Sequence, residues 1–204
     1  MFEPPTVEDE VVLVGRSNVG KTTLMREMVG KKYDVGSRPG VTIEPNRYEW
    51  NAEGFAVTDL PGFGFMSGVD EEKRERIKDA VVRYLEENSD DILVAVQVID
   101  ASAFVEIVGR WRDRGEVPHD VDLHGCLVDI DVPVVVAANK TDKVDDDDAT
   151  LDGIADRLGY PPPWQQWDDV IAPTCAKRGS TDALFDAVRE HITDQGRDDL
   201  LKFF

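Results

Sequence analysis

Hydrophobic residues form short, nearly unbroken runs that alternate with longer segments in which apolar positions recur every three or four residues. The runs cover 11–14, 92–99, 132–138 and 170–173, and they are typical of strands buried on both faces of a parallel sheet. The helical spacing predicts helices over 22–29 and 72–87 and a closing helix capped by Ser180. The buried stripe of that last helix comprises Ala183, Leu184, Ala187, Val188 and Ile192. This alternation predicts a doubly wound α/β sheet.

One hairpin interrupts the parallel pattern. Residues 47–50 and 55–58 read as strands joined through Ala52-Glu53-Gly54, so we expect six strands, mostly parallel, with one antiparallel edge strand. No internal repeat or Gly/Ser-rich linker divides the chain, which predicts a single domain over 1–204 with a flexible N-terminus at 1–9. Four segments read as long, functional loops, namely 30–45, 62–70, 109–125 and 160–167.

Charge changes the picture of possible partners. The 204 residues carry 42 acidic and 23 basic side chains and a net charge of −19, which argues against broad adhesion to nucleic acid or anionic lipid. Contact with RNA therefore needs a local basic patch, for which Lys73-Arg74-Glu75-Arg76 and residues 110–114 are the candidates. The 27 Asp residues and only 9 Lys residues are typical of a protein from a halophilic, high-potassium cytoplasm.

Several classes of protein are disfavoured. The longest apolar run, 92–99, is far shorter than the ~18 residues that a membrane span needs, so no membrane partner is expected. The N-terminus is acidic and lacks the pattern of a secretory signal. Cys126 and Cys175 suit a reducing cytoplasm, and Cys126 with His119 and His124 lacks the second ligand pair of a zinc site. We expect a cytoplasmic monomer.

A phosphate-binding loop directly follows the first predicted strand. Its residues are Gly15, Arg16, Ser17, Asn18, Val19, Gly20, Lys21 and Thr22, with Thr23 continuing into the predicted helix. Its glycines let backbone N–H groups surround a polyphosphate at the positive end of the helix. Lys21 would reach the β and γ phosphates, and the Thr22 hydroxyl would ligate Mg²⁺.

A second motif selects the base. Asn139-Lys140-Thr141-Asp142 ends a buried strand, and the Asp142 carboxylate can accept from both N1–H and the amine of guanine. Asn139 would contact the base edge or tie the loops together, and the Lys140 stem would lie along the ring. A further segment comprises Thr174, Cys175, Ala176 and Lys177. There the Ala176 N–H could donate to guanine O6.

The γ-phosphate and Mg²⁺ have candidate ligands between these motifs. Asp59-Leu60-Pro61-Gly62 ends the third strand, where Asp59 can hold Mg²⁺ and the Gly62 N–H can approach the phosphate. Upstream, Gly40 precedes Val41 and Thr42, and Thr42 is the second predicted hydroxyl ligand of Mg²⁺.

With five motifs in this order, the chain resembles the translation-factor-related GTPases of the TrmE-Era-EngA-EngB-Septin class. Phe63-Gly64-Phe65 after Gly62 resembles the EngB (YihA) family in particular. The resemblance implies a Ras-like G domain, GTP or GDP with Mg²⁺, slow GTP hydrolysis and a large-ribosomal-subunit precursor as partner. The alternative is a non-catalytic guanine-nucleotide-dependent module for cell division and septum formation. The chain departs from the family at Val41, at Asn139 and in the length of 109–125.

Hydrolysis needs a group that orients water, and the position after Gly62 carries Phe63, an apolar ring, where many GTPases have glutamine. Asn18 resembles the asparagine of potassium-activated GTPases, in which K⁺ takes the place of an arginine finger; alternatively, Asn18 only braces the loop. The predicted catalytic set is therefore Asn18, Lys21, Thr42 and Gly62.

Overall fold

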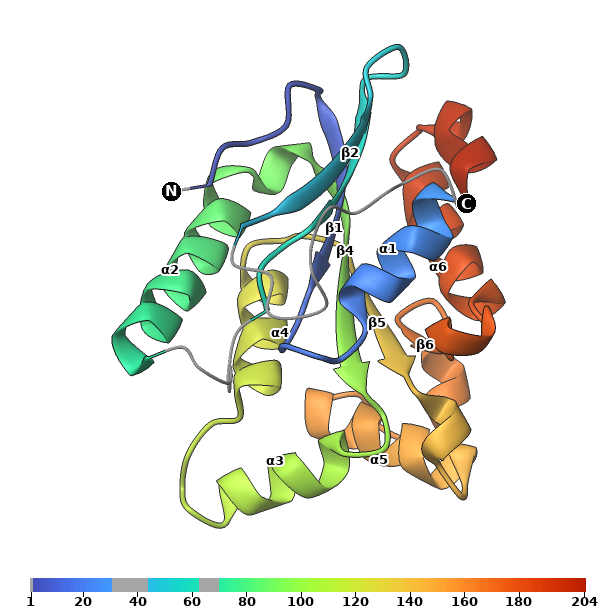
Figure 1. Cartoon of the computed structure of the whole chain (residues 1–204). Coiled ribbons are helices and arrows are strands. Elements are labelled where there is room, and N and C mark those ends of the chain that lie inside the picture. Colours follow the sequence, from blue (N-terminus) through green and yellow to red (C-terminus); the bar gives the residue numbers. More distant parts are fainter. Residues whose placement is uncertain (1, 31–43, 63–69) are drawn as a thin grey trace.

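A six-stranded sheet in the order β2-β3-β1-β4-β5-β6 forms the centre of the protein (Figure 1). The computed structural model describes residues 2–30, 44–62 and 70–204. The strands are β1 Asp9–Val14, β2 Asn46–Trp50, β3 Phe55–Asp59, β4 Ile92–Asp100, β5 Val134–Asn139 and β6 Ile171–Pro173. The helices are α1 Lys21–Val29, α2 Glu71–Glu87, α3 Phe104–Arg112, α4 His119–Asp129, α5 Asp147–Leu158 and α6 Asp182–Asp194. The predicted α/β class is confirmed.

Strand pairing also follows the prediction. The pairs β1–β3, β1–β4, β4–β5 and β5–β6 are parallel, whereas β2 pairs with β3 in an antiparallel hairpin at the edge of the sheet. The strands β1, β4 and β5 point toward the same end of the molecule, the lower end in Figure 1. Loops that follow these strands therefore meet at one edge, where α/β proteins bind ligands.

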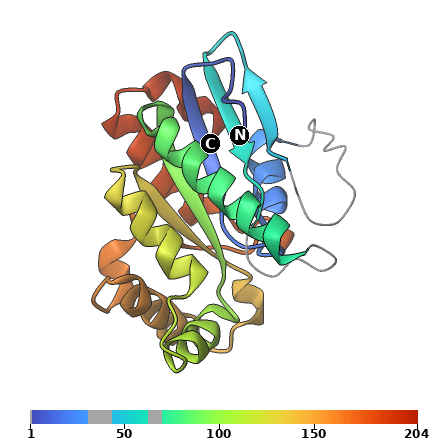
Figure 2. The ribbon, with the colours of Figure 1, turned by 90° about the vertical axis from the view of Figure 1, so that its left-hand side faces the viewer.

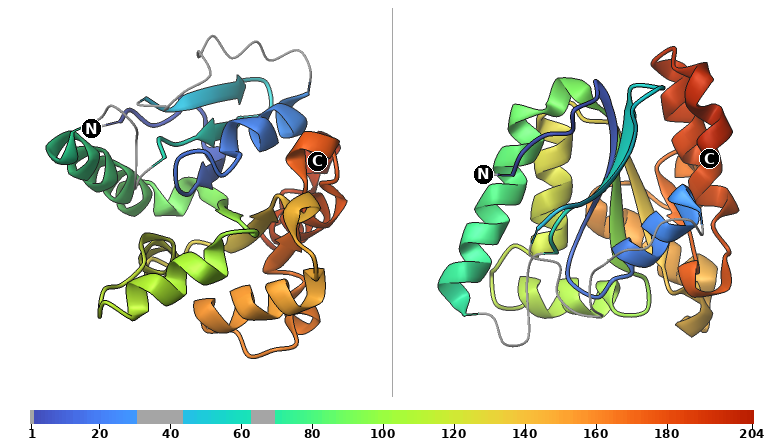
Figure 3. Two further views of the ribbon diagram at one scale, coloured as in Figure 1. Left: turned by 60° about the horizontal axis from the view of Figure 1, so that its bottom comes forward. Right: turned by 45° about the horizontal axis from the view of Figure 1, so that its top comes forward.

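Alternate strand residues face two separate cores. Val12 and Val14 pack with residues of α2, α3, α4 and α5, and Val11 and Leu13 pack with residues of α1 and α6. Figures 2 and 3 show these two helical layers on opposite sides of the sheet. Because both faces are covered, the central strands read as continuous apolar runs, which is why the sequence pattern located them.

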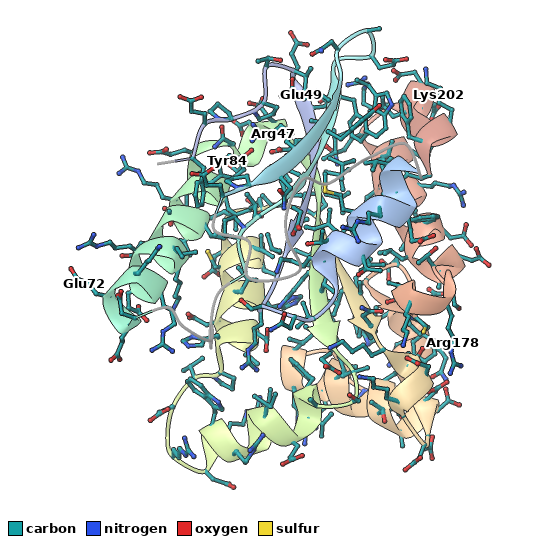
Figure 4. All side chains as sticks on the ribbon, in the orientation of Figure 1. Arg47, Glu49, Glu72, Tyr84, Arg178 and Lys202 are labelled. Carbon is teal, nitrogen blue, oxygen red and sulfur yellow. The ribbon has the colours of Figure 1, made fainter. Side chains whose placement is uncertain are left out.

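A buried carboxylate ties four elements together on the α2 side of the sheet. Glu10 of β1 is fully buried and accepts hydrogen bonds from the Thr58 hydroxyl of β3 and from the Tyr84 hydroxyl of α2, the latter at 2.7 Å. Arg47 of β2 donates to Thr58 Oγ1 at 3.0 Å and to the Tyr84 hydroxyl at 3.1 Å (Figure 4). Burial raises the pKa of Glu10, and these hydrogen-bond donors oppose that rise.

The expected loop over 109–125 is wrong. Helices α3 and α4 occupy most of it, and only residues 113–118 connect them. Phe104 and Val108 form the buried stripe of α3, and Leu123 and Leu127 form that of α4, each pair at helical spacing. Gly109 and Gly125, which suggested loop ends, lie within these helices where an added Cβ would meet no atom within 4 Å.

Smaller differences concern element ends. The segment 160–167 contains a short 3₁₀ helix, Trp164–Trp167, and α6 begins after Thr181 rather than after Ser180. The acidic run 145–148 leads into α5, where the Asp146 side chain caps the helix by accepting from the Ala149 N–H at 3.0 Å. The N-terminal segment contacts β2 through Thr6, which donates to Glu49, and β1 already begins at Asp9.

Among the described helices, none is long and apolar enough to cross a bilayer.

Candidate functional site

The phosphate-binding loop lies between β1 and α1, at the carboxyl edge of the sheet (Figure 1). Gly20 precedes α1 with φ +113°, a conformation that side chains rarely adopt, and a Cβ there would collide with the Asn139 amide. A larger residue would therefore separate the loop from the 139–142 segment. The Thr23 N–H donates to Gly20 O at 3.0 Å and starts the helix, so the loop and the helix N-terminus form one unit.

Lys21 is buried at the centre of the loop. Its ammonium donates to the carbonyl oxygens of Gly15 at 3.1 Å and of Arg16 at 2.9 Å. Burial lowers the pKa of Lys21, and the carboxylates of Asp59 and Asp120 oppose that change. A Cβ on Gly62 would lie 2.9 Å from the Lys21 ammonium and 2.8 Å from the Ser17 backbone nitrogen. Only glycine therefore fits where the Asp59–Gly62 segment meets the loop.

Thr22 and Asp59 form a small oxygen-rich cluster beside the loop. The Thr22 hydroxyl donates to Asp59 Oδ2 at 2.5 Å. Asp59 is fully buried, and its Oδ1 has no hydrogen-bond partner among the described residues. Burial raises the pKa of Asp59, and the Lys21 ammonium and the Thr22 hydroxyl oppose that rise. A buried carboxylate oxygen without a donor is costly unless a cation neutralises it. This pair of hard oxygen ligands fits Mg²⁺, which takes few protein ligands and the oxygens of bound phosphates.

Asn139 joins three segments at the other end of the site. Its amide nitrogen donates to Val19 O in the phosphate-binding loop at 2.8 Å. Its amide oxygen accepts from the Ala176 N–H at 3.0 Å and from the Thr174 hydroxyl at 3.4 Å. Of its two predicted roles, the structure displays the tie between loops. The Ala176 N–H, expected to reach a base, is bound to Asn139 here.

The two charged residues of the 139–142 segment contact different parts of the chain. Lys140, at φ +69°, donates to Asn18 O at 2.8 Å. Asp142 Oδ2 lies 3.6 Å from a guanidinium nitrogen of Arg178, whose side chain is 68% exposed (Figure 4). Cys175 and Ala176 are buried and Lys177 is exposed. The segment 174–177 thus lies next to the 139–142 segment, as its place after the neighbouring strand predicted.

Some predicted site residues lie outside the described part of the chain, namely Gly40, Thr42 and Phe63. Asn18 is described: it is exposed, its φ is +66°, and its side chain makes no hydrogen bond with any described residue. Val19 is buried beside it. The exposed Asn18 amide is therefore available to a ligand.

Sequence reasoning missed two carboxylates near the site. Asp100 ends β4 and contacts Lys140, and Asp120 near the start of α4 is buried 3.9 Å from Arg16. Burial raises the pKa of Asp120 to about 6, while Arg16 and Lys21 oppose the rise. The position of Asp100 at the carboxyl end of a predicted strand was a usable signal. Asp120 gave none, because its segment was expected to be a loop.

His124 is held by hydrogen bonds within the protein. His124 is buried, with Nδ1 2.8 Å from Gln97 Oε1 and Nε2 2.9 Å from the Tyr160 hydroxyl. The Gln97 amide nitrogen is occupied in donating to Asp120 O, so His124 carries its proton on Nδ1 and accepts from Tyr160. Among the described residues, no group of three or more His, Cys, Asp or Glu side chains could hold a metal ion.

Comparison with known proteins gives the family. A family model described as "50S ribosome-binding GTPase" matches residues 10–140. A probable GTP-binding protein EngB of Halorubrum lacusprofundi is 58% identical over 204 residues, covering 100% of this chain and 99% of that protein. The EngB protein of Haloarcula marismortui is 53% identical, with 100% of both chains covered.

A solved structure agrees with these relatives. The crystal structure of a probable GTP-binding protein EngB superimposes with a TM-score of 0.78 at 40% sequence identity, covering 89% of this chain and 99% of that one. The archaeal FeoB G domain from Methanococcus jannaschii, at 21% identity and a TM-score of 0.52, shares the fold. The chain belongs to the EngB family of GTP-binding proteins.

Proposed function

We propose that this protein is a GTP-hydrolysing nucleotide switch that acts in assembly of the large ribosomal subunit. The observation that carries the proposal is the Asn139 clamp, which joins the phosphate-binding loop to both segments of the base site. The description of the matching family, 50S ribosome-binding GTPase, supports a ribosomal partner. The net charge of −19 and the halophilic relatives support action as a monomer in a salt-rich cytoplasm.

In this proposal, Asp142 selects guanine over adenine. Its carboxylate accepts from N1–H and from the amine of guanine, and adenine presents a lone pair at N1 instead. Leaving a carboxylate against a lone pair costs about 1–3 kcal/mol or more, which favours GTP over ATP. Arg178 lies near the same carboxylate, at 3.6 Å, with its side chain largely exposed.

In this proposal, the phosphate-binding loop and Lys21 bind the phosphates. Gly15 O and Arg16 O already hold the Lys21 ammonium in place. Its positive charge can therefore offset the negative charge of the β and γ phosphates without a rearrangement of the side chain. Thr22 and Asp59 would hold Mg²⁺, with Thr42 as the additional ligand inferred from sequence. The ion, when bound, neutralises charge on the phosphate oxygens. The N–H groups of Gly62 and Gly40 are proposed to contact the γ-phosphate.

Intrinsic hydrolysis is proposed to be slow. The residue after Gly62 is Phe63, and its ring can neither accept from nor donate to the attacking water. Lys21 would stabilise charge on the phosphate but would not orient that water. A partner or a monovalent cation beside Asn18 would supply the remaining stabilisation.

The base assignment has a direct test. Asp142→Asn exchanges an acceptor for a donor, so the variant should lose GTP and GDP and gain xanthosine nucleotides, whose C2 carbonyl needs a donor. Equilibrium titration with fluorescent guanosine and xanthosine diphosphates measures both changes. Asp146 is unsuitable as a control because it caps α5, whereas exposed Asp145→Asn removes the same charge nearby and should change neither affinity. Equal affinity of the unmodified protein for ATP and GTP would disprove the assignment.

The basic cluster Lys73-Arg74-Glu75-Arg76 lies on α2, and its three cations line two different grooves. Lys73 and Arg76 line one groove with Phe2 and Ile77, and Arg76 pairs with Glu72. Arg74 lies on the other side with Lys78, in a groove of about 260 Å³ that also contains Arg16 of the phosphate-binding loop. Three cations, Trp111 and His119 line this second groove together with Glu71 and Glu75. Because Arg16 and α2 both adjoin the nucleotide site, we assign ribosomal docking mainly to the Arg74 side.

Sedimentation tests the ribosomal role. The protein should co-sediment with large-subunit particles in a non-hydrolysable GTP analogue and should do so less in GDP. Arg74→Glu should reduce co-sedimentation more than Arg76→Glu, and each lost phosphate contact should flatten the salt dependence by about one unit of slope. Arg83→Glu, on the same helix and paired with Glu87, is the matched control. If no nucleotide state co-sediments at the working salt concentration, the division-module alternative replaces the ribosomal one.

A further inference from the structure

Asp100 is the last residue of β4, directly beside the base-site segment. In the parallel β4–β5 ladder, Asp100 is the register partner of Asn139, and the Ala101 N–H donates to Asn139 O at 2.8 Å. The backbone at Asp100 is thus fixed relative to Asn139 by the sheet itself. None of the five nucleotide motifs includes this residue.

The Asp100 carboxylate uses its two oxygens for two different tasks. Oδ2 accepts from the Lys140 ammonium at 2.6 Å, forming an ion pair whose side chains are 23% and 24% exposed. Oδ1 accepts from the Ser102 hydroxyl at 2.6 Å and from the Ser102 N–H at 3.2 Å. Burial raises the pKa of Asp100, but the hydrogen bonds from Lys140 and Ser102 outweigh it and leave this pKa below its ordinary value.

The same ammonium also holds the phosphate-binding loop. Lys140 Nζ donates to Asn18 O at 2.8 Å, so one lysine bridges β4 and the loop. A free lysine side chain samples many rotamers, and fixing it costs entropy when a ligand binds. Asp100 and Asn18 fix this side chain through contacts within the protein itself. The cost is therefore met by folding rather than by binding.

We propose that Asp100 is a positioning residue for guanine-nucleotide binding, which holds Lys140 so that the lysine stem forms a preformed wall of the base site. The inference rests on the guanine site proposed above. Because the Lys140 stem belongs to the proposed base site, which GDP and GTP share, we expect Asp100 to affect the binding of both nucleotides. It acts only through Lys140 and touches no nucleotide.

Asp100→Asn tests this inference, because it keeps the shape and removes the charge. Stopped-flow release of fluorescent GDP and GTP analogues should be about tenfold faster for both nucleotides, with association nearly unchanged. Asp186→Asn is the control, since Asp186 pairs with Arg189 at the same 2.6 Å on α6, away from the site, and its release rates should equal those of the unmodified protein. Ser102→Ala should show a smaller change in the same direction. Ser102 is exposed, so that variant keeps the test available if Asp100→Asn does not fold.

A double-mutant cycle separates positioning from general stability. Lys140→Met keeps an unbranched stem and removes the ammonium, so adding Asp100→Asn to it should change the release rate less than twofold, because interacting residues are not additive. Full tenfold effects in both backgrounds would overturn the inference. So would release from Asp100→Asn at the unmodified rate. If the unmodified protein binds no GDP at all, the proposed guanine site fails, which is a different result.

Discussion

The residues of the site differ in how many of their polar atoms form hydrogen bonds within the protein. Asn139 and Lys140 use their polar atoms within the protein, whereas Asp59 Oδ1 and the Asn18 amide have no partner among the described residues. Buried or converging polar groups without protein partners are where ligands and ions bind. At this scale, Asp59 Oδ1 and the Asn18 amide are the groups of the proposed phosphate site that a ligand or ion could still occupy, whereas Lys21 and Thr22 beside them already have protein partners.

Asn18 carries a prediction about monovalent cations. If its exposed amide helps to seat K⁺ against the phosphates, GTP hydrolysis should be roughly tenfold or more faster in KCl than in NaCl at equal ionic strength, because a charge in this place stabilises the transition state. Asn18→Ala should abolish the difference and leave GDP affinity unchanged, as measured by phosphate release and by nucleotide titration. Equal rates in both salts, with the protein folded in each, would leave Asn18 as a residue that braces the loop.

Among the elements, β4 and α4 are joined by a buried polar chain from Gln97 to His124 and on to Tyr160. Both nitrogens of His124 are used in its neutral form. Burial lowers the pKa of His124 from its ordinary 6.5 to about 4. A histidine with a lowered folded-state pKa stabilises the fold above pH 6.5 and loses that contribution as pH falls toward 4.

The packing of α4 on β4 should therefore weaken in acid. Between pH 6.5 and 4, His124 should remove at most about 3 kcal/mol from the free energy of unfolding. His124→Asn keeps a donor toward Gln97 but cannot titrate, so it should be less stable at pH 7 and lose less stability on acidification. Urea unfolding of both proteins across this range measures the difference. The opposite titration of Asp120, whose raised pKa of about 6 favours folding in acid, is common to both proteins and cancels. Parallel stability curves would contradict the assignment.

The elements that sequence predicted best are those with a local signature. Strands buried on both faces show as Val-rich runs, and the Gly15–Thr22 spacing between a strand and a helix predicted the phosphate-binding loop. Helices α3 and α4 were missed because Gly109, Gly125 and Pro118 resemble loop punctuation. The Asp100–Lys140 pair joins residues 40 positions apart, so no local pattern reveals it. Contacts between elements, unlike the elements, require the fold.

The whole molecule carries its excess of acid mostly on its surface. At a net charge of −19, the acidic side chains repel one another. Salt shortens the screening length of this repulsion from about 10 Å at 0.1 M to about 3 Å at 1 M. Surface ion pairs such as Arg83–Glu87 are exposed and offset little of this. The fold as a unit is therefore expected to depend on salt more than any one of its contacts does.

Urea unfolding in increasing KCl tests this dependence. The unfolding midpoint should rise between 0.1 and about 2 M KCl as like charges are screened. Asp145→Lys and Glu116→Lys together make the net charge less negative by four in exposed connecting segments and should raise the low-salt midpoint more than the high-salt one. The same two positions changed to Gln give an intermediate control. If the charge variant gains equally at every salt concentration, self-repulsion is not the cause.

The Glu10 network also constrains how the chain is made. Glu10 is synthesised 74 residues before its partner Tyr84, and Arg47 and Thr58 appear in between. A carboxylate without donors is expensive to bury, so we expect β1 to stay hydrated during synthesis until Tyr84 of α2 is available. Because β1 also pairs with β4, which is made after α2, we expect the N-terminal strands to be buried together with α2 and β4 rather than before them.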